Sequence, residues 1–327
     1  LSGLDDVMIG DTIADPAQPE ALPRIAIEEP TIKIRFSIND SPMAGLSGKY
    51  VTSRHLRERL EREAERNIAM RVEPTDDMES FYVYGRGELM LTILAETMRR
   101  EGYELALSMP EVATKEIDGK LYEPVELVVC DVPDEFVGAI TTKLGERKGV
   151  LSNLNSLGFG RTRVEFRVPS RGLIGFRGVF LTETRGQGLL NTIFDDWAPY
   201  AGPMLRRKNG ALVSDRKGVA TPYALFNLQP RGELFIGPST EVYEGMIVGE
   251  HSRENDLDIN VTREKKLTNI RAAGRDENVI LAPPRKITLE GALEWIDADE
   301  LVEVTPNAIR LRKKILECNR RPKRVVG

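Results

Sequence analysis

Apolar and polar residues alternate near the start of the chain in a way that predicts one supersecondary unit. In 32–38 every second residue is apolar, the pattern of a half-buried strand. In 51–67 apolar residues recur every fourth position behind a capping region at Thr52 and Ser53, which predicts a helix. The elements that follow are strands at 69–74 and 80–85, a helix at 87–102 and a strand at 103–109. The predicted order is βαββαβ.

The same order returns in the next part of the chain. Strand patterns lie at 125–129, 162–168 and 189–194, and a helix pattern lies at 134–149. The glycine-rich stretch 170–188 takes the place of the second helix. Both units therefore match the ferredoxin-like motif, in which two helices cover one face of a four-stranded antiparallel sheet. We predict an α+β fold with two such domains.

The stretch 170–188 carries glycine at Gly172, Gly175 and Gly178, a spacing that fits neither nucleotide-binding glycine motif. A glycine inside a helix costs up to about 1 kcal/mol relative to alanine, so some interaction must offset it. One hypothesis is that the missing side chains let the helix lie close on its own sheet. The other is that a partner's backbone approaches the glycines while arginines meet phosphates. Those arginines are Arg171, Arg177 and Arg185.

From residue 201 onward short β-like runs such as 223–229 predict a separate, mainly β domain with one short helix at 289–297. Its segment 251–277 is polar and has no sustained period, and loops of this length are usually functional or disordered. We predict an RNA-contacting loop there. Its candidate residues are Asn260, Arg263, Lys265, Lys266, Arg271 and Arg275.

A second basic run, 310–324, has Glu317 as its one acidic residue. Two interpretations stay open for it: a disordered, solvated end of the chain, or a second RNA-contacting element. The net charge of −5 argues against a nucleic-acid partner when taken alone, but 201–327 is basic on an otherwise acidic chain.

The composition, 41% hydrophobic over 327 residues, is that of a soluble globular protein of two or three domains. Cys130 and Cys318 form no disulfide framework, and no apolar run reaches the length needed to cross a bilayer, so we expect a cytoplasmic location and no membrane partner. His55 and His251 have no metal-site or triad spacing around them. We predict no catalytic residue and no metal site.

The segment 43–50 resembles a phosphate-binding loop, but Met43 replaces its first glycine and Tyr50 stands where Ser or Thr would coordinate magnesium. We therefore expect no nucleotide site there.

Several long motifs resemble the C-terminal part of the BipA/TypA family, bacterial translational GTPases related to elongation factor G. They are SPMAGLSGKYVTSRHL, YGRGELML, SRGLIGFRGVFLTETRGQG, FDDWAPYAG and HSRENDLDIN followed by KKLTNIRA. The resemblance spans the chain and implies four parts. They are the tail of a β-barrel domain at 1–23, ferredoxin-like domains at 24–112 and 113–200 that are similar to the third and fifth domains of elongation factor G, and a family-specific domain at 201–327.

The resemblance also implies a function. It implies a ribosome-binding portion that contacts ribosomal RNA and the A-site region, with A-site tRNA as a further partner, in translation or in ribosome assembly under stress. DNA is not an expected partner. Neither the phosphate-binding loop nor the guanine motif occurs, so we expect no GTPase activity and no cofactor in this chain, GTP and magnesium belonging to the intact protein. The alternative is a regulatory protein that binds a small ligand between tandem ferredoxin-like domains.

Overall fold

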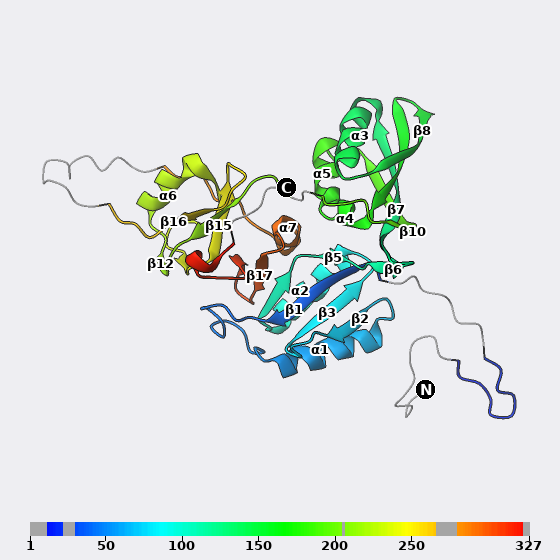
Figure 1. Cartoon of the computed structure of the whole chain (residues 1–327), viewed down its shortest axis with the longest axis horizontal. Helices are drawn as coiled ribbons and strands as arrows, with labels where there is room; N and C mark the ends of the chain where they lie inside the picture. Colours follow the sequence, from blue (N-terminus) through cyan, green and yellow to red (C-terminus); the bar gives the residue numbers. More distant parts are fainter. Residues whose placement is uncertain (1–11, 22–29, 205–206, 266–279, 323–327) are drawn as a thin grey trace, which may run out of the picture. The chain divides into compact units, whose positions relative to one another are not determined.

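The computed structural model describes residues 12–21, 30–204, 207–265 and 280–322 (Figure 1). By their contacts these residues form two compact units, and each is described by itself. The first unit takes in the described residues of 1–38, 50–98 and 110–204, and the second those of 39–49, 99–109 and 205–327. None of the described helices is long and apolar enough to span a membrane.

The predicted βαββαβ order of the first ferredoxin-like segment is confirmed. Its elements are β1 (Ile32–Ile38), α1 (Ser53–Arg66), β2 (Arg71–Pro74), β3 (Ser80–Gly85), α2 (Glu88–Glu101) and β4 (Leu105–Ser108). Strand β3 pairs antiparallel with both β1 and β2. The alternating residues Ile34 and Phe36 of β1 are buried, as are Leu56 and Leu60 of α1. Thr52 caps α1 through its side chain.

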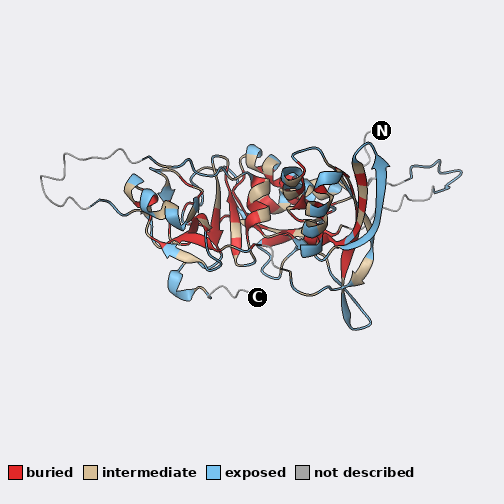
Figure 2. Ribbon diagram, turned by 90° about the horizontal axis from the view of Figure 1, so that it is seen from above, coloured by how far each residue is buried: buried red, intermediate tan, exposed pale blue. Residues whose placement is uncertain are grey.

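The second ferredoxin-like segment lies wholly in the first unit. Its elements are β7 (Lys120–Pro133), the short η1 (Asp134–Phe136), α3 (Val137–Glu146), β8 (Val150–Gly158), β9 (Arg161–Pro169), α4 (Ser170–Leu173), α5 (Phe176–Glu183) and β10 (Leu189–Pro199). The antiparallel sheet has the order β10–β7–β9–β8, with the short β6 (Lys115–Ile117) paired to β7. Apolar residues of β7 and β9 form one core with those of α3 and α5. The sequence patterns missed β8, all nine residues of which are exposed (Figure 2).

The prediction of one continuous helix over 170–188 is wrong. The stretch forms α4 and α5, separated at Gly175, whose φ of 70° ends the first helix and would strain any residue with a Cβ. The N–H of Gly175, left outside the helical ladder, donates to Glu88 Oε1 of α2 at 3.2 Å. The break in the helix therefore provides a contact between the two ferredoxin-like segments.

The first hypothesis for the glycines holds at Gly172. A Cβ placed there would lie 2.7 Å from the backbone oxygen of Arg147 and 3.2 Å from the side chain of Val168. Arg147 Nη1 in turn donates to the backbone oxygens of Gly172 and Ile174. Gly178, in contrast, is exposed on α5. Only part of the glycine content therefore serves packing on the sheet.

The predicted mainly β character of the C-terminal segment is confirmed. Its strands are β11 (Ala211–Ser214), β12 (Gly218–Val219), β13 (Gly232–Leu234), β14 (Glu241–Val242), β15 (Met246–His251), β16 (Leu257–Ile259), β17 (Glu300–Val304) and β18 (Ile309–Lys313). Its helices are α6 (Pro222–Leu228), η2 (Gln229–Arg231), α7 (Leu289–Trp295) and η3 (Cys318–Arg320). In the second unit the sheet runs β16–β11–β15–β18–β17–β4, and β13 also pairs with β15.

The β-like run 223–229 is an error of the sequence prediction, because it forms helix α6. Thr221 caps this helix by accepting a hydrogen bond from Ala224 N–H, and Pro222 occupies the first turn, where a missing N–H costs nothing. Leu225 then packs into a core with Leu212, Val248 and other apolar residues, and Ala224 is buried beside it in the sequence. Capping and tertiary packing decide the structure here over β propensity.

Buried charges hold the centre of the second unit together. The carboxylate of Glu300 accepts two hydrogen bonds from Arg207, both 2.9 Å long, and one of 2.8 Å from Lys313 Nζ. Lys313 also reaches Asp299 at 2.8 Å and Asp256 at 2.6 Å. Burial alone would lower the pKa of Lys313, but these three carboxylates outweigh it and raise that pKa above its usual value.

A second buried carboxylate, Glu303, binds three further partners. Arg310 Nη1 donates at 2.8 Å, the Tyr243 hydroxyl at 2.7 Å and Asn39 Nδ2 at 3.1 Å. Burial and the Glu303 charge raise the pKa of Tyr243, so its hydroxyl stays a donor. Asn39 also donates to Glu104, which accepts the backbone N–H groups of 45, 47 and 48.

These pairs overturn the interpretation of 310–324 as a disordered end. Its first residues form β18, in which Arg312 and Lys313 are both 1% exposed. Arg312 pairs with Asp40, and Arg321 pairs with Asp258 at 2.7 Å. Residues 323–327 lie outside the described part of the chain.

Replacing Lys313 by Met should lower the free energy of unfolding of the second unit by about 3 to 5 kcal/mol, because it leaves the buried Glu300 and its neighbours short of a positive charge. Urea unfolding followed by tryptophan fluorescence, to which Trp295 contributes, measures the loss. The matched control is Lys314→Met, an exposed neighbour that should change stability by less than about 0.5 kcal/mol. Equal stability of the two variants would contradict the role assigned to Lys313.

Replacing Gly172 by Ala should destabilise the second ferredoxin-like segment by about 1 to 3 kcal/mol, since its Cβ meets the Arg147 backbone. The exposed Gly178→Ala should instead stabilise the segment by up to about 1 kcal/mol through helix propensity. Thermal unfolding of both variants tests this contrast. A destabilising Gly178→Ala would show that α5 packs more tightly than its exposure indicates.

Candidate nucleic-acid interface

Three adjoining depressions on the second unit form what we call the basic groove. The first is about 320 Å³, the second about 390 Å³ and the third about 570 Å³. The first and second share Arg231 and Leu257, and the second and third share Ser252, Arg253 and Asn255. The cations along the groove are Arg263, Arg231, Arg253 and Lys208, all exposed.

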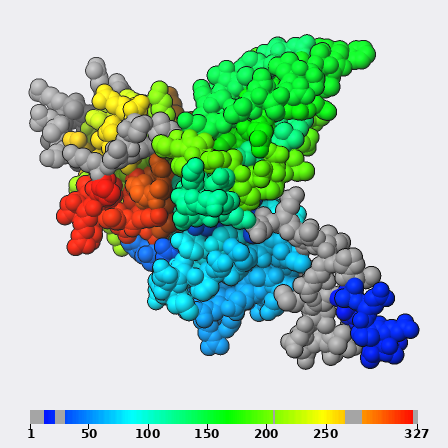
Figure 3. All heavy atoms as spheres, turned by 45° about the vertical axis from the view of Figure 1, so that its right-hand side comes forward, coloured from blue at the N-terminus to red at the C-terminus, as the bar shows by residue number. Residues whose placement is uncertain are grey.

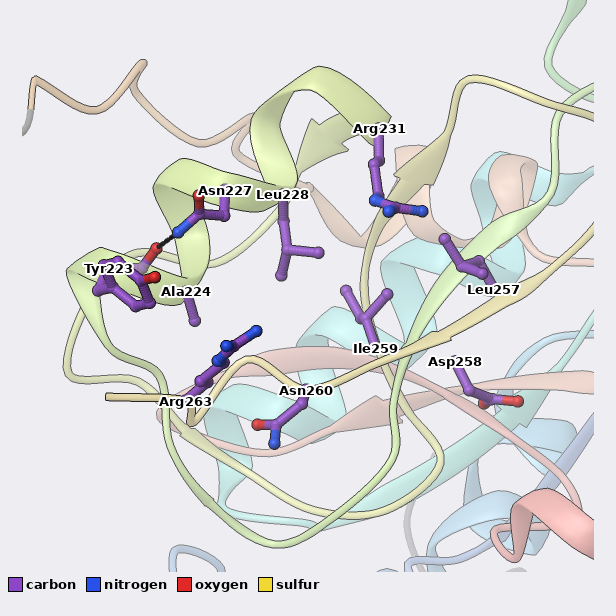
Figure 4. Close-up of a pocket in the computed structure, with 10 residues that line it drawn as sticks. All are labelled: Tyr223, Ala224, Asn227, Leu228, Arg231, Leu257, Asp258, Ile259, Asn260 and Arg263. Atoms are coloured by element: carbon purple, nitrogen blue, oxygen red, sulfur yellow. Dashed lines mark hydrogen bonds between the residues drawn. The ribbon is translucent and has the colours of Figure 1, made fainter. Parts of the chain in front are cut away.

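The first depression lies between helix α6 and strand β16 (Figure 4). Arg231 and Arg263 lie on opposite sides of it, and the apolar side chains of Leu228 and Ile259 lie between them. Tyr223 and Asn227 of α6 complete one wall, where Asn227 Nδ2 donates to the backbone oxygen of Tyr223 at 2.7 Å. The site thus joins an apolar floor to guanidinium and amide groups at its rim.

Thr221 fixes the backbone on which Arg263 stands. Its hydroxyl donates to the Arg263 backbone oxygen at 2.6 Å, and its N–H donates to the backbone oxygen of Val261 at 3.0 Å. Asn260 turns the chain just before, because its Oδ1 accepts from both the N–H and the hydroxyl of Thr262 at 2.9 Å. Both interactions leave the Arg263 side chain at the surface.

One carboxylate of the first depression, Asp258, is already compensated. Arg321 pairs with it at 2.7 Å, and the Cys318 thiol donates to it at 3.0 Å. This hydrogen bond, together with burial, raises the pKa of Cys318. In contrast, no ion pair within the described residues engages Lys208, Arg231, Arg253 or Arg263. Glu254 lines the third depression, so the groove carries four cations against two carboxylates and is positive on balance.

A close backbone approach sets the shape of the other two depressions. The turn 252–256 folds over Gly210, where a Cβ would collide with the backbone of Asn255. Gly210 N–H donates to the Arg253 backbone oxygen at 2.7 Å, and Asp256 Oδ1 accepts from Ala211 N–H at 2.7 Å. His251, which is buried, contacts the Asn255 backbone oxygen through Nδ1 at 2.6 Å. The histidine thus holds a turn. The described residues contain no group of three or more His, Cys, Asp or Glu side chains that could hold a metal ion.

The structure brings only part of the predicted RNA site together. Asn260 and Arg263 line the first depression, and Lys265 is exposed two residues further on. Lys266, Arg271 and Arg275 lie outside the described residues. The segment 251–277 also differs from the structureless loop that was predicted, because β16 lies in it and pairs in parallel with β11.

The three arginines predicted in the glycine-rich stretch have different surroundings. Arg171 forms a bidentate pair with the buried Glu123, donates to the Gly202 backbone oxygen and stacks on Tyr200. Its hydrogen-bonding capacity is thus used inside the protein. Arg177 and Arg185 are exposed, and Arg185 lies over the Phe136 ring. An RNA contact of these arginines stays a prediction.

The sequence analysis missed three cations of the groove, Arg231, Arg253 and Lys208. Arg231 and Arg253 stand between neutral or acidic neighbours, so no local cluster marks them, and Lys208 ends a short basic run, 206–208, that the sequence analysis did not single out. They meet because η2, the turn after β15 and the segment just before β11 converge in the fold.

The comparisons with known proteins agree with this architecture. The family model "Elongation factor G C-terminus" matches residues 120–208, so this part is similar to the C-terminal part of elongation factor G. The family model "TypA/BipA C-terminal domain" matches residues 209–318.

Relatives match nearly the whole chain. "Large ribosomal subunit assembly factor BipA" of Salmonella typhimurium is 53% identical over 98% of this chain, and its namesake in Haemophilus influenzae is 51% identical over 98%. The Synechocystis protein of that name is 50% identical over 96%. The chain spans about half the length of these relatives, 52 to 53%. It belongs to the BipA/TypA family.

Proposed function

We propose that this chain is a ribosome-binding part of its family's protein and that the basic groove binds ribosomal RNA through phosphates. The observation that carries the proposal is the row of four exposed cations without a described carboxylate partner. Phosphate oxygens are the chief partners of arginine and lysine at nucleic-acid interfaces. The relatives named as assembly factors of the large ribosomal subunit make ribosomal RNA the first candidate.

The groove also offers more than charge. Its first depression has a tyrosine, two asparagines and an apolar floor, groups that can contact sugars and bases beside the phosphates. Asn260 Nδ2 makes no hydrogen bond within the described part of the chain, so it remains available as a donor. We propose that Lys265 and the basic residues beyond it extend this surface, and that A-site tRNA is a second partner.

Replacing Arg231, Arg253 and Arg263 together by Gln should weaken binding to large ribosomal subunits and flatten its salt dependence by up to about three units of log-log slope. Co-sedimentation across a salt series measures both quantities. The matched control replaces three exposed lysines of the same unit that line none of the depressions, Lys217, Lys286 and Lys314, also by Gln. The proposal fails if both triple variants lose the same affinity, because nonspecific charge would then explain the binding.

Replacing Lys265, Lys266 and Arg271 together by Ala should lower the same affinity further. The melting temperature should stay nearly unchanged, because the sequence predicts a polar loop there and substitutions in such loops rarely alter stability. The two triple variants should combine additively in free energy if they act on separate phosphates. Unchanged affinity and slope in a normally folded variant would remove these residues from the site.

A further inference from the structure

The hairpin between β8 and β9 breaks a local rule of backbone structure. Gly158 pairs with Arg161 in the ladder, so Phe159 and Gly160 are the two central residues of the turn. Both have positive φ, 53° and 74°, the requirement of a type I′ turn. Asn-Gly is the favoured pair for this turn, whereas a bulky aromatic residue is disfavoured in the left-handed region.

Phe159 gains nothing from packing that would offset this strain. Its relative exposure is 106%, the highest among the large exposed apolar residues of the described chain. A Cβ at either flanking glycine, Gly158 or Gly160, would meet no atom within 4 Å. The hairpin therefore holds an aromatic ring in open solvent, with free space on both sides of it. A strained and exposed aromatic residue points to a partner that covers it.

The charge around the ring favours RNA as that partner. Between Val150 and Val164 the hairpin itself has no acidic residue, and it carries Arg161 two residues after Phe159. Arg161 Nη2 donates to the backbone oxygens of Asp131 and Gln187, which joins the hairpin to the turn that carries the exposed Arg185. The exposed Asp134 also lies beside the turn, because its N–H donates to the Gly160 backbone oxygen at 3.0 Å, and its carboxylate accepts from the Thr162 hydroxyl at 2.7 Å. An aromatic ring beside guanidinium groups is a usual means of binding unstacked bases.

The hairpin lies at the projecting edge of the second ferredoxin-like segment (Figure 3). Strand β8 is the last strand of its sheet, and its outer edge has no partner among the described strands. Leu154 and Leu157 on this strand are 50% and 45% exposed, so an apolar protein surface is the rival partner. The two partners differ in what they require of residue 159: a base needs an aromatic face, whereas an apolar pocket also accepts an aliphatic side chain.

We propose that Phe159 stacks on an unpaired nucleobase of RNA, which, if the function proposed above holds, is ribosomal RNA. Stacking contributes through contact of two flat faces and releases no counterions. Its share of the affinity is therefore insensitive to salt, in contrast to that of the basic groove.

The test uses Phe159→Asn, Phe159→Trp and Phe159→Leu in the full 327-residue chain, with large ribosomal subunits and protein-free large-subunit RNA as the two probes. Phe159→Asn should weaken binding to both probes by roughly 5- to 100-fold, the range of one lost stacking contact, without changing the salt slope. It should also raise the melting temperature, since asparagine suits the turn. Phe159→Trp should keep the wild-type affinity, and Phe159→Leu should lose as much as Phe159→Asn.

Two results would overturn the inference. If Phe159→Leu keeps full affinity and Phe159→Asn loses affinity only for intact subunits, the ring binds an apolar protein pocket. Unchanged affinity of Phe159→Asn would show that nothing covers the ring. In the second case the proposed function still stands if the wild-type chain binds and the triple variant of the basic groove binds more weakly. If the wild-type chain binds neither probe, both proposals fail.

Discussion

The buried carboxylates of Glu300 and Glu303 are the constraint on which the second unit depends. Both are completely buried on β17, and a charge in such a place is tolerated only when opposite charges and hydrogen bonds satisfy it. Their partners come from distant parts of the chain: Asn39, Arg207, Tyr243, Arg310 and Lys313. If one partner were missing, a buried charge would be left unpaired. These segments must therefore assemble together. Hydrophobic burial alone would not select this set of neighbours.

The same network determines the position of the candidate interface. Lys313 binds Glu300 inside the unit and Asp256 at the base of the turn 252–256. Burial opposes ionisation of Asp256, but Lys313 and the Ala211 N–H outweigh it and hold its pKa below the usual value. Stability from a lowered carboxyl pKa is present above about pH 4 and is lost as the pH falls through the folded-state pKa. The turn that bears Arg253 is therefore fixed across the neutral range, so its charge needs little reordering to bind.

The sequence predicted those parts of the fold in which burial is periodic. Strand β9 alternates buried Val164, Phe166 and Val168 with residues that are half-buried or exposed, and the sequence shows this alternation of apolar and polar residues. Strand β8 was not predicted, because none of its residues is buried and its sequence therefore shows no alternation of buried and exposed positions. The break at Gly175 escaped as well, because a glycine between two helical turns is compatible both with a continuous helix and with a left-handed residue.

The candidate site was harder to predict than the fold, for a physical reason. Asn260 and Arg263 could be found because they adjoin a locally basic segment. Arg231, Arg253 and Lys208 could not, because only tertiary pairing gathers them. The basic run 310–324 shows the opposite error: Arg312 and Lys313 look like a solvated tail in sequence, yet their partners Asp40 and Glu300 make them part of the interior.

Net charge is therefore a poor guide to the partner of this protein. Its value of −5 counts every ionisable side chain alike. In the structure the carboxylates of Glu123, Glu300 and Glu303 form ion pairs with arginines inside the protein, and these pairs contribute little to the electric field that a ligand meets. What a polyanion meets is the charge left over at the surface after internal pairing. Along the basic groove that remainder is positive, so an acidic protein can carry a surface suited to RNA.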